Sequence, residues 1–194
     1  EMTDEHRGRI IGIVGVDDEC GASLLSMMLA LQYSESNHQR TTLIDLDTKK
    51  GTVSSVFGLV SQPNDAAQSD SRDDSTVRLL QINDRSLNLV GSTSQSIASL
   101  EKGSLKNLLT MLDQLAECND VVILDFPPVG RPDRVLSMVS QLDQIVVIVE
   151  SQKTSMETAL RLVRQIEKCG GQIAGVVLTK WSRYMPQWLE KLLG

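Results

Sequence analysis

The segment GVDDECGAS, residues 15–23, lies between an apolar run and a helix-like run and has the spacing of a phosphate-binding loop. Such a loop normally reads GxxxxGK[ST]. Its backbone amides and the following helix N-terminus bind phosphate, and its lysine neutralises phosphate charge. Gly21 and Ser23 fit this pattern, whereas Val16 replaces the first glycine and Ala22 replaces the lysine. We assign the predicted loop to Cys20, Gly21, Ala22, Ser23 and Leu24.

Three acidic residues, Asp17, Asp18 and Glu19, precede the predicted loop and oppose an anionic ligand. A carboxylate about 6 Å from a phosphate charge costs roughly 3 kcal/mol at an effective dielectric constant of 20, unless it points outward. Cys20 lies near the expected helix N-terminus, which would lower a thiol pKa. The alternative is that Cys20 is a small residue without a chemical role.

Further carboxylates follow two apolar runs, at Asp45 and Asp47 and at Asp125. The carboxyl ends of parallel strands meet at one edge of a sheet, where ligands bind. In phosphate-loop proteins, the serine after the lysine position and an aspartate ending a later strand hold Mg²⁺. We therefore expect Ser23 and Asp125 to be metal ligands, if Mg²⁺ binds. The alternatives are ordinary solvation at a strand end and a turn residue before the two prolines.

The elements that must position these residues alternate along the chain. The pattern predicts an α/β, three-layer, phosphate-loop NTPase-like fold, with a mostly parallel sheet and helices on both faces. A Thr154-x-x-Glu157 capping box is expected to open one helix. Strands are expected at residues 9–15, 41–47, 77–82, 87–90, 121–125, 144–149 and 173–178, and helices at 22–33, 52–60, 104–117, 132–139, 154–169 and 186–193.

Composition supports a single domain over residues 1–194. Hydrophobic residues make up 41% of the chain but aromatic residues only 3%, so aliphatic side chains must form the core. Residues 61–76 contain no large apolar side chain and are expected to form a mobile polar loop. The net charge of −6 argues against nucleic acid as a partner. The three cysteines form no CxxC pair, which favours a reducing cytoplasm.

Several segments resemble the MinD/ParA-type deviant-Walker proteins, and in particular their bacterial tyrosine kinase (BY-kinase) branch. These segments are LIDLD at residues 43–47, DFPPV at 125–129 and QIAGVVLTK at 172–180. The resemblance covers about residues 9–180, and DFPPV is its most specific part. It implies ATP or ADP with Mg²⁺ as ligands and a role in capsule or exopolysaccharide export. Because the chain departs from the family in its loop, we expect nucleotide and Mg²⁺ to bind weakly or not at all.

The resemblance implies roles for individual residues. Asp45 would be the catalytic base, retained as a relic or with weak activity, and Asp47 would be the Mg²⁺ partner. Asp125 would be the Walker B aspartate. The chain departs from the kinases at Ala22 and in its acidic loop, and Thr179 stands where relatives usually have an asparagine. The predicted C-terminal tail has one tyrosine instead of a cluster. The scaffold is therefore expected to be kept and the kinase chemistry lost.

The leading hypothesis is a degenerate BY-kinase, a pseudokinase that acts as a scaffold or regulator. Its expected partner is the cytoplasmic segment of an inner-membrane, Wzz-like polysaccharide co-polymerase, which would place it in the cytoplasm at the membrane periphery. A homo-oligomer is a further alternative. A second hypothesis is a weak ATPase or tyrosine kinase in which Arg131, Arg134, Lys49 or Lys50 replaces the lysine. A third is a MinD/ParA-like positioning protein of a pilus or secretion system.

The C-terminal segment, residues 185–193, is predicted to form an amphipathic helix. Met185, Trp188, Leu189 and Leu192 fall on one face of that helix. This face could dock on its own domain, or it could contact a membrane surface or a membrane-embedded partner, since tryptophan and basic residues suit interfaces.

Overall fold

The computed structural model describes residues 7–36, 39–58, 77–82, 85–91, 105–128 and 132–181, which have an α/β fold built on a seven-stranded sheet. The strand order is β3-β4-β2-β5-β1-β6-β7, and only the hairpin between β3 and β4 is antiparallel. The strands are β1 (Arg9–Gly15), β2 (Thr41–Asp45), β3 (Val77–Ile82), β4 (Arg85–Val90), β5 (Val121–Asp125), β6 (Gln144–Glu150) and β7 (Ile173–Thr179).

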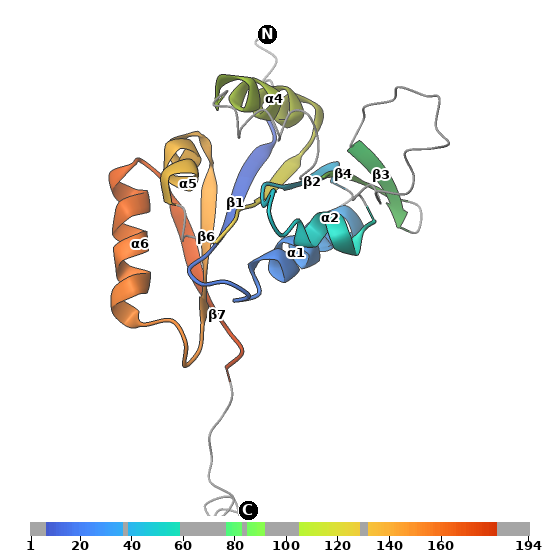
Figure 1. Ribbon diagram of the computed structural model, residues 1–194. Helices are drawn as coiled ribbons and strands as arrows, with labels where there is room; N and C mark the ends of the chain where they lie inside the picture. The colour runs from blue at the N-terminus through green and yellow to red at the C-terminus, as the bar shows by residue number, and fades with distance from the viewer. Residues whose placement is uncertain are drawn as a thin grey trace, which may run out of the picture.

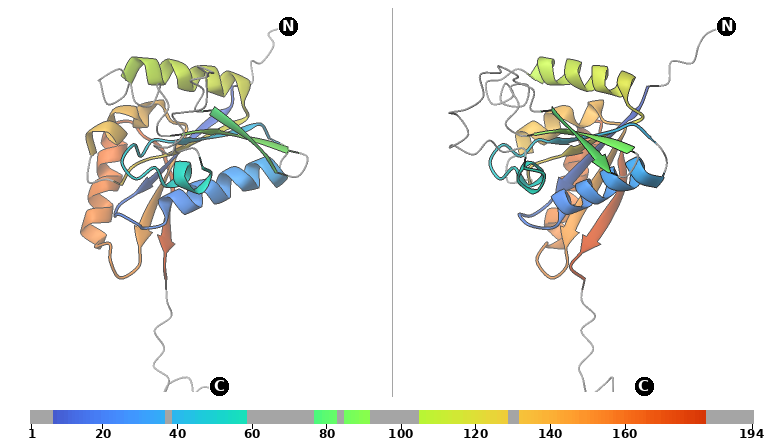
Figure 2. Two further views of the ribbon diagram at one scale, coloured as in Figure 1. Left: turned by 45° about the vertical axis from the view of Figure 1, so that its right-hand side comes forward. Right: turned by 90° about the vertical axis from the view of Figure 1, so that its right-hand side faces the viewer.

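Helices cover both faces of the sheet, as Figures 1 and 2 show. One face is covered by α1 (Ala22–Ser36) and α2 (Thr52–Val56), and its core includes Met27 and Val53. The other face is covered by α4 (Leu105–Cys118), α5 (Pro132–Met138), a short 3₁₀ turn η2 (Val139–Gln141) and α6 (Met156–Lys168). The three-layer fold with a mostly parallel sheet is therefore confirmed.

Burial on both faces is consistent with the almost purely apolar sequence of the central strand β5. Every residue of β2 and β5 is buried, because helices lie above and below them. A strand buried on both faces reads as a continuous hydrophobic run instead of an alternating one. Ile123 and Leu124, adjacent in β5, belong to the two different cores.

The structure differs from the sequence-based expectation at several element ends. Helix α1 ends at Ser36 rather than at residue 33, strand β2 ends at Asp45 rather than at residue 47, and strand β4 begins at Arg85 rather than at residue 87. Helix α2 ends at Val56 rather than at residue 60.

Helix α6 is capped by Ser155, whose hydroxyl accepts a hydrogen bond from the Thr158 amide, so the capping box predicted at Thr154 was wrong. The hydroxyl of Thr154 is instead bonded to Asp17 and to the Glu150 amide, which takes it away from the helix.

The polar segment 61–76 and the tail 185–193 lie outside the described residues, so both expectations stay predictions. No helix in the described part of the chain combines the length and apolar character needed to cross a membrane.

Truncating Leu124, which is fully buried, should lower the free energy of unfolding. We expect Leu124→Ala to cost about 2–5 kcal/mol, because the cavity left in a close-packed core is only partly refilled. The matched control is Met156→Ala, since Met156 is 75% exposed and its loss should change stability by about 0.5 kcal/mol or less. Urea denaturation measures both, and equal effects would contradict the described core.

Candidate functional site

The loop between β1 and α1 has the backbone shape of an anion-binding site. Glu19 and Gly21 both have positive φ, at 62° and 94°, so the chain reverses just before the helix. The first hydrogen bond of the helix start runs from the Leu25 amide to the Gly21 carbonyl. Within the described structure, the amides of Gly21, Ala22, Ser23 and Leu24 therefore have no backbone acceptor. Such amides at a helix N-terminus attract anions.

Cys20 packs beneath the loop and does not face solvent. Its side chain is 2% exposed, and burial raises the pKa of its thiol despite nearby backbone amides. A Cβ at position 15 would lie 2.6 Å from Cys20 Sγ, so the glycine there allows the sulfur to pack against the strand end. These contacts favour the interpretation of Cys20 as a packing residue.

Two segments from the C-terminal half hold the loop in place. The Thr179 hydroxyl donates to the Cys20 carbonyl at 2.6 Å and also lies 3.1 Å from the Val149 carbonyl. Thr154 donates to the Asp17 carboxylate. Lys153 Nζ donates to the Asp18 carbonyl at 2.7 Å. The loop is therefore tied to β7 and to the connection between β6 and α6.

Asp45 ends β2 and is completely buried. One carboxylate oxygen accepts hydrogen bonds from the Ser54 amide at 2.9 Å and the Ser54 hydroxyl at 2.7 Å, and the other accepts from the Asp47 amide at 3.1 Å. Burial is the main reason that the pKa of Asp45 is raised, and the Ser54 bonds oppose this rise. These bonds fix α2 against the end of β2.

Asp125 ends β5 directly beside Asp45 in the parallel register. The Ser26 hydroxyl donates to Asp125 Oδ1 at 2.9 Å, while the buried Oδ2 accepts no hydrogen bond from any described residue. Burial raises the pKa of Asp125 to about 7, and the hydroxyls of Ser23 and Ser26 moderate the rise. An unpartnered carboxylate oxygen of this kind is suited to receive a cation.

Two adjoining cavities open along the loop. The inner one, ≈ 210 Å³, is lined by the loop, Asp47, Thr52 and Phe126, and the outer one, ≈ 460 Å³, by Val16, Lys49 and Pro127 among others. Residues that line both are Asp17, Asp18, Asp47, Lys50 and Pro128. The two cavities therefore share a wall, and the inner one lies against the first residues of α1.

The residues predicted from the sequence are largely brought together here. Cys20, Gly21, Ala22, Ser23, Leu24 and Asp47 all line the inner cavity. Asp45 and Asp125 are buried and do not line this cavity, so the role of Asp45 as a base stays a prediction.

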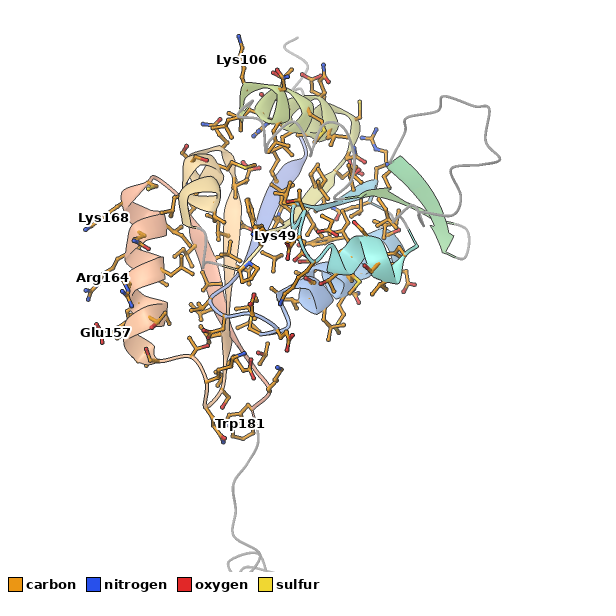
Figure 3. The ribbon with its side chains drawn as sticks, in the orientation of Figure 1. Lys49, Lys106, Glu157, Arg164, Lys168 and Trp181 are labelled. Atoms are coloured by element: carbon orange, nitrogen blue, oxygen red, sulfur yellow. The ribbon has the colours of Figure 1, made fainter. Side chains whose placement is uncertain are left out.

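Of the basic residues considered as substitutes for the missing lysine, Lys49 and Lys50 lie at the site, on the connection from β2 to α2 (Figure 3). Arg131 and the side chain of Arg134 lie outside the described residues.

Sequence reasoning missed Lys153 and Thr154 as part of the site and did not foresee that Thr179 contacts the loop. Lys153 and Thr154 follow β6, and Thr179 ends β7, at the same edge of the sheet as the loop. Their position after the strands was the available signal, because strand ends in a parallel sheet gather at one edge.

Oxygen ligands suit Mg²⁺. Asp47 and Ser23 line the inner cavity, whereas the unpartnered Asp125 Oδ2 is buried and lines neither cavity. No three His, Cys, Asp or Glu side chains gather as a metal centre in the residues that the structure describes. Mg²⁺ commonly binds through one or two carboxylates, with substrate phosphates and water completing its shell. The residues present therefore fit a magnesium ion that arrives with a phosphate ligand, and such an ion would neutralise phosphate charge.

The family follows from a comparison with known proteins. The chain matches the ParA family model, described as NUBPL iron-transfer P-loop NTPase, over residues 8–186. It therefore belongs to the ParA family of P-loop NTPases. The tyrosine-protein kinase ptk of Acinetobacter johnsonii is 28% identical over 182 residues. That match covers 91% of this chain and 24% of the kinase, so the chain spans about a quarter of the length of this relative.

Solved structures share the fold. The kinase domain of Escherichia coli tyrosine kinase ETK has a TM-score of 0.68 at 17% identity, covering 95% of this chain and 73% of that one. Cobyrinic acid a,c-diamide synthase from Mycobacterium smegmatis, with bound ADP and magnesium, has a TM-score of 0.63 at 17% identity, covering 96% and 80%. The chain thus resembles kinase domains and other P-loop proteins in the arrangement of its elements.

The raised pKa of Asp125 predicts a pH-dependent stability in magnesium-free buffer. Because the folded pKa of about 7 exceeds the ordinary value of 3.8, the folded state holds a proton that the unfolded state has lost. The free energy of unfolding should therefore fall as the pH rises from about 4 to about 7. Asp125→Asn removes this fall, so the variant should gain up to about 4 kcal/mol relative to wild type between pH 4 and pH 8.

Chemical denaturation across this pH range measures the effect. Asp113→Asn is the matched control, because Asp113 is 67% exposed on α4 and should leave the pH profile unchanged. Parallel profiles for wild type and Asp125→Asn would contradict the described burial.

The hydrogen bond from Thr179 to the Cys20 carbonyl, which tethers the loop, predicts how fast the three cysteines are alkylated. Cys20 should alkylate much more slowly than the exposed Cys118 and Cys169, which serve as internal references. Thr179→Val removes the hydroxyl that bonds to the Cys20 carbonyl, and we expect Cys20 labelling to accelerate several-fold because local opening becomes easier. Mass spectrometry after iodoacetamide treatment measures each site. Thr110→Val, on the exposed face of α4, is the control, and an equal acceleration there would refute a local tether.

Proposed function

We propose that this protein is a degenerate BY-kinase-like component of exopolysaccharide or capsule export that acts as a scaffold or regulator. The observation that carries the proposal is Ala22 at the lysine position of a loop whose acidic side chains line the same cavity. Removing one electrostatic stabiliser of a transition state typically costs about 10²–10³ in rate. The likeness to tyrosine kinases supports the choice of system.

The proposed partner is the cytoplasmic segment of an inner-membrane polysaccharide co-polymerase. In this proposal, the protein lies in the cytoplasm at the membrane periphery because its partner holds it there. Nucleotide is at most a structural ligand, which would bind with Mg²⁺ at Ser23, Asp47 and Asp125. The bound ADP and magnesium of the Mycobacterium smegmatis synthase support this ligand class.

The second candidate is a weak ATPase or tyrosine kinase in which a basic residue outside the loop replaces the lysine. The observations that favour it are Ser23 and Asp47 in the lining of one cavity, and Asp125 at the end of the strand beside Asp45. A ParA-like positioning role is the third candidate, and the family membership supports it.

Turnover assays separate the first two candidates. We expect no Mg²⁺-dependent ATP hydrolysis and no tyrosine phosphorylation by the wild-type protein. A purified cytoplasmic segment of a co-polymerase should bind it to the same extent with and without ATP. Isothermal calorimetry measures the binding, and phosphate release measures the turnover.

Magnesium-dependent turnover that is abolished in Asp45→Ala but retained in Asp113→Ala would overturn the pseudokinase proposal in favour of an enzyme. Failure of the co-polymerase segment to bind would overturn the scaffold proposal. Ala22→Lys provides a further comparison, because restoring the lysine should strengthen nucleotide binding whichever candidate is correct.

A further inference from the structure

Lys50 presents its ammonium group to the phosphate loop from a different part of the chain. Its Nζ lies 3.4 Å from Asp18 Oδ1 and 4.0 Å from Glu19 Oε1. It lines both cavities, and it is the only basic residue among the described residues that line the inner one, where Ala22 and Ser23 also lie. A cation therefore faces the loop that lacks its own lysine.

Hydrogen bonds to Asp47, which lines both cavities, fix the backbone at Lys50. Asp47 Oδ1 accepts hydrogen bonds from the Lys50 and Lys49 amides, each at 3.1 Å. The next amide, that of Gly51, donates to the Asp47 carbonyl at 2.8 Å. The side chain therefore extends from a well-bonded turn, and this limits the positions that its ammonium group can reach.

The acidic partners of Lys50 hold it only weakly. The side chains of Lys50, Asp18 and Glu19 are 45%, 65% and 81% exposed, and solvent screens ion pairs of this kind. A polyphosphate carries more negative charge and would also be bound by the N-terminus of α1, where the first amides have no backbone acceptor in the described residues. It can therefore displace the two carboxylates from the ammonium group.

We propose that Lys50 is the phosphate-binding cation of this loop, and that Asp18 and Glu19 occupy it while no polyanion is bound. The ligand class is a nucleoside di- or triphosphate. The acidic residues then act as competitors that lower the affinity without preventing binding. This inference deepens the proposed function and rests on the part of it in which nucleotide binds at the loop as a structural ligand.

Calorimetric titration with Mg²⁺–ATP and Mg²⁺–ADP tests the role of Lys50. Lys50→Ala should weaken binding about tenfold or more, as expected for the loss of a charge-assisted contact. Lys168→Ala, on the outer face of α6, is the control for charge loss alone and should leave the affinity unchanged (Figure 3). Equal losses in Lys49→Ala and Lys50→Ala would overturn the proposal, because they would indicate a general charge effect.

A double-mutant cycle separates contact with phosphate from mere shielding of the acidic residues. The double variant Asp18→Asn/Glu19→Gln should bind about tenfold more tightly than wild type, because it releases Lys50 and removes repulsion. Adding Lys50→Ala to this background should weaken binding by tenfold or more. If Lys50→Ala has no effect there, Lys50 only neutralises its neighbours and the proposal is refuted.

Absence of binding at millimolar nucleotide in both wild type and the double variant would also refute the proposal. The measurement is binding, not turnover or capture of a partner. It can therefore fail while the scaffold function stands, and it can succeed while that function fails.

Discussion

The parallel pairing of β1, β5 and β2 is the constraint on which the rest of the structure depends. It places Ile13, Asp125 and Asp45 at equivalent positions on three neighbouring strands, so the loop after β1 lies beside both carboxylates. The pairing itself follows from strands that are apolar on both faces and must be covered by helices. Because the carboxyl ends of parallel strands share one edge, the polar residues at the ends of these strands gather in one place.

Burial and charge then act against each other at that edge. Burial raises the pKa of both Asp45 and Asp125, but Asp45 is bonded to Ser54 and to a backbone amide, which oppose the rise, whereas Asp125 Oδ2 has no such partner. The loop adds three carboxylates in front of this site. Lys50 pairs with the carboxylate of Asp18, Lys153 donates to the Asp18 carbonyl, and Thr154 donates to the Asp17 carboxylate. An anionic ligand must therefore compete with the loop carboxylates for the cations and hydrogen-bond donors around the site.

Much of the fold could be predicted because its signals are local. Apolar runs such as that of β5 and the leucine face of α4 are visible in the sequence, and so are the loop residues from Cys20 to Leu24. The contacts of Lys50, Lys153 and Thr179 with the loop could not be predicted, since they join residues far apart in the chain and depend on strand order. The cap of α6 was misplaced because Thr154 and Ser155 are both good capping residues. The bonds of the Thr154 hydroxyl to Asp17 and to the Glu150 amide decide between them.

The hydrogen bond from Thr154 to Asp17 has a thermodynamic consequence for α6. Thr154 immediately precedes the residue that caps this helix, so its hydroxyl joins the phosphate loop to the helix start. A ligand that draws Asp17 away from Thr154 alters the free energy of the first helical turn, and by reciprocity a molecule that grips that turn alters the ligand's affinity. The first turn of α6, which carries Glu157 on its outer face (Figure 3), is thereby joined through Thr154 to a loop near the opposite end of the sequence.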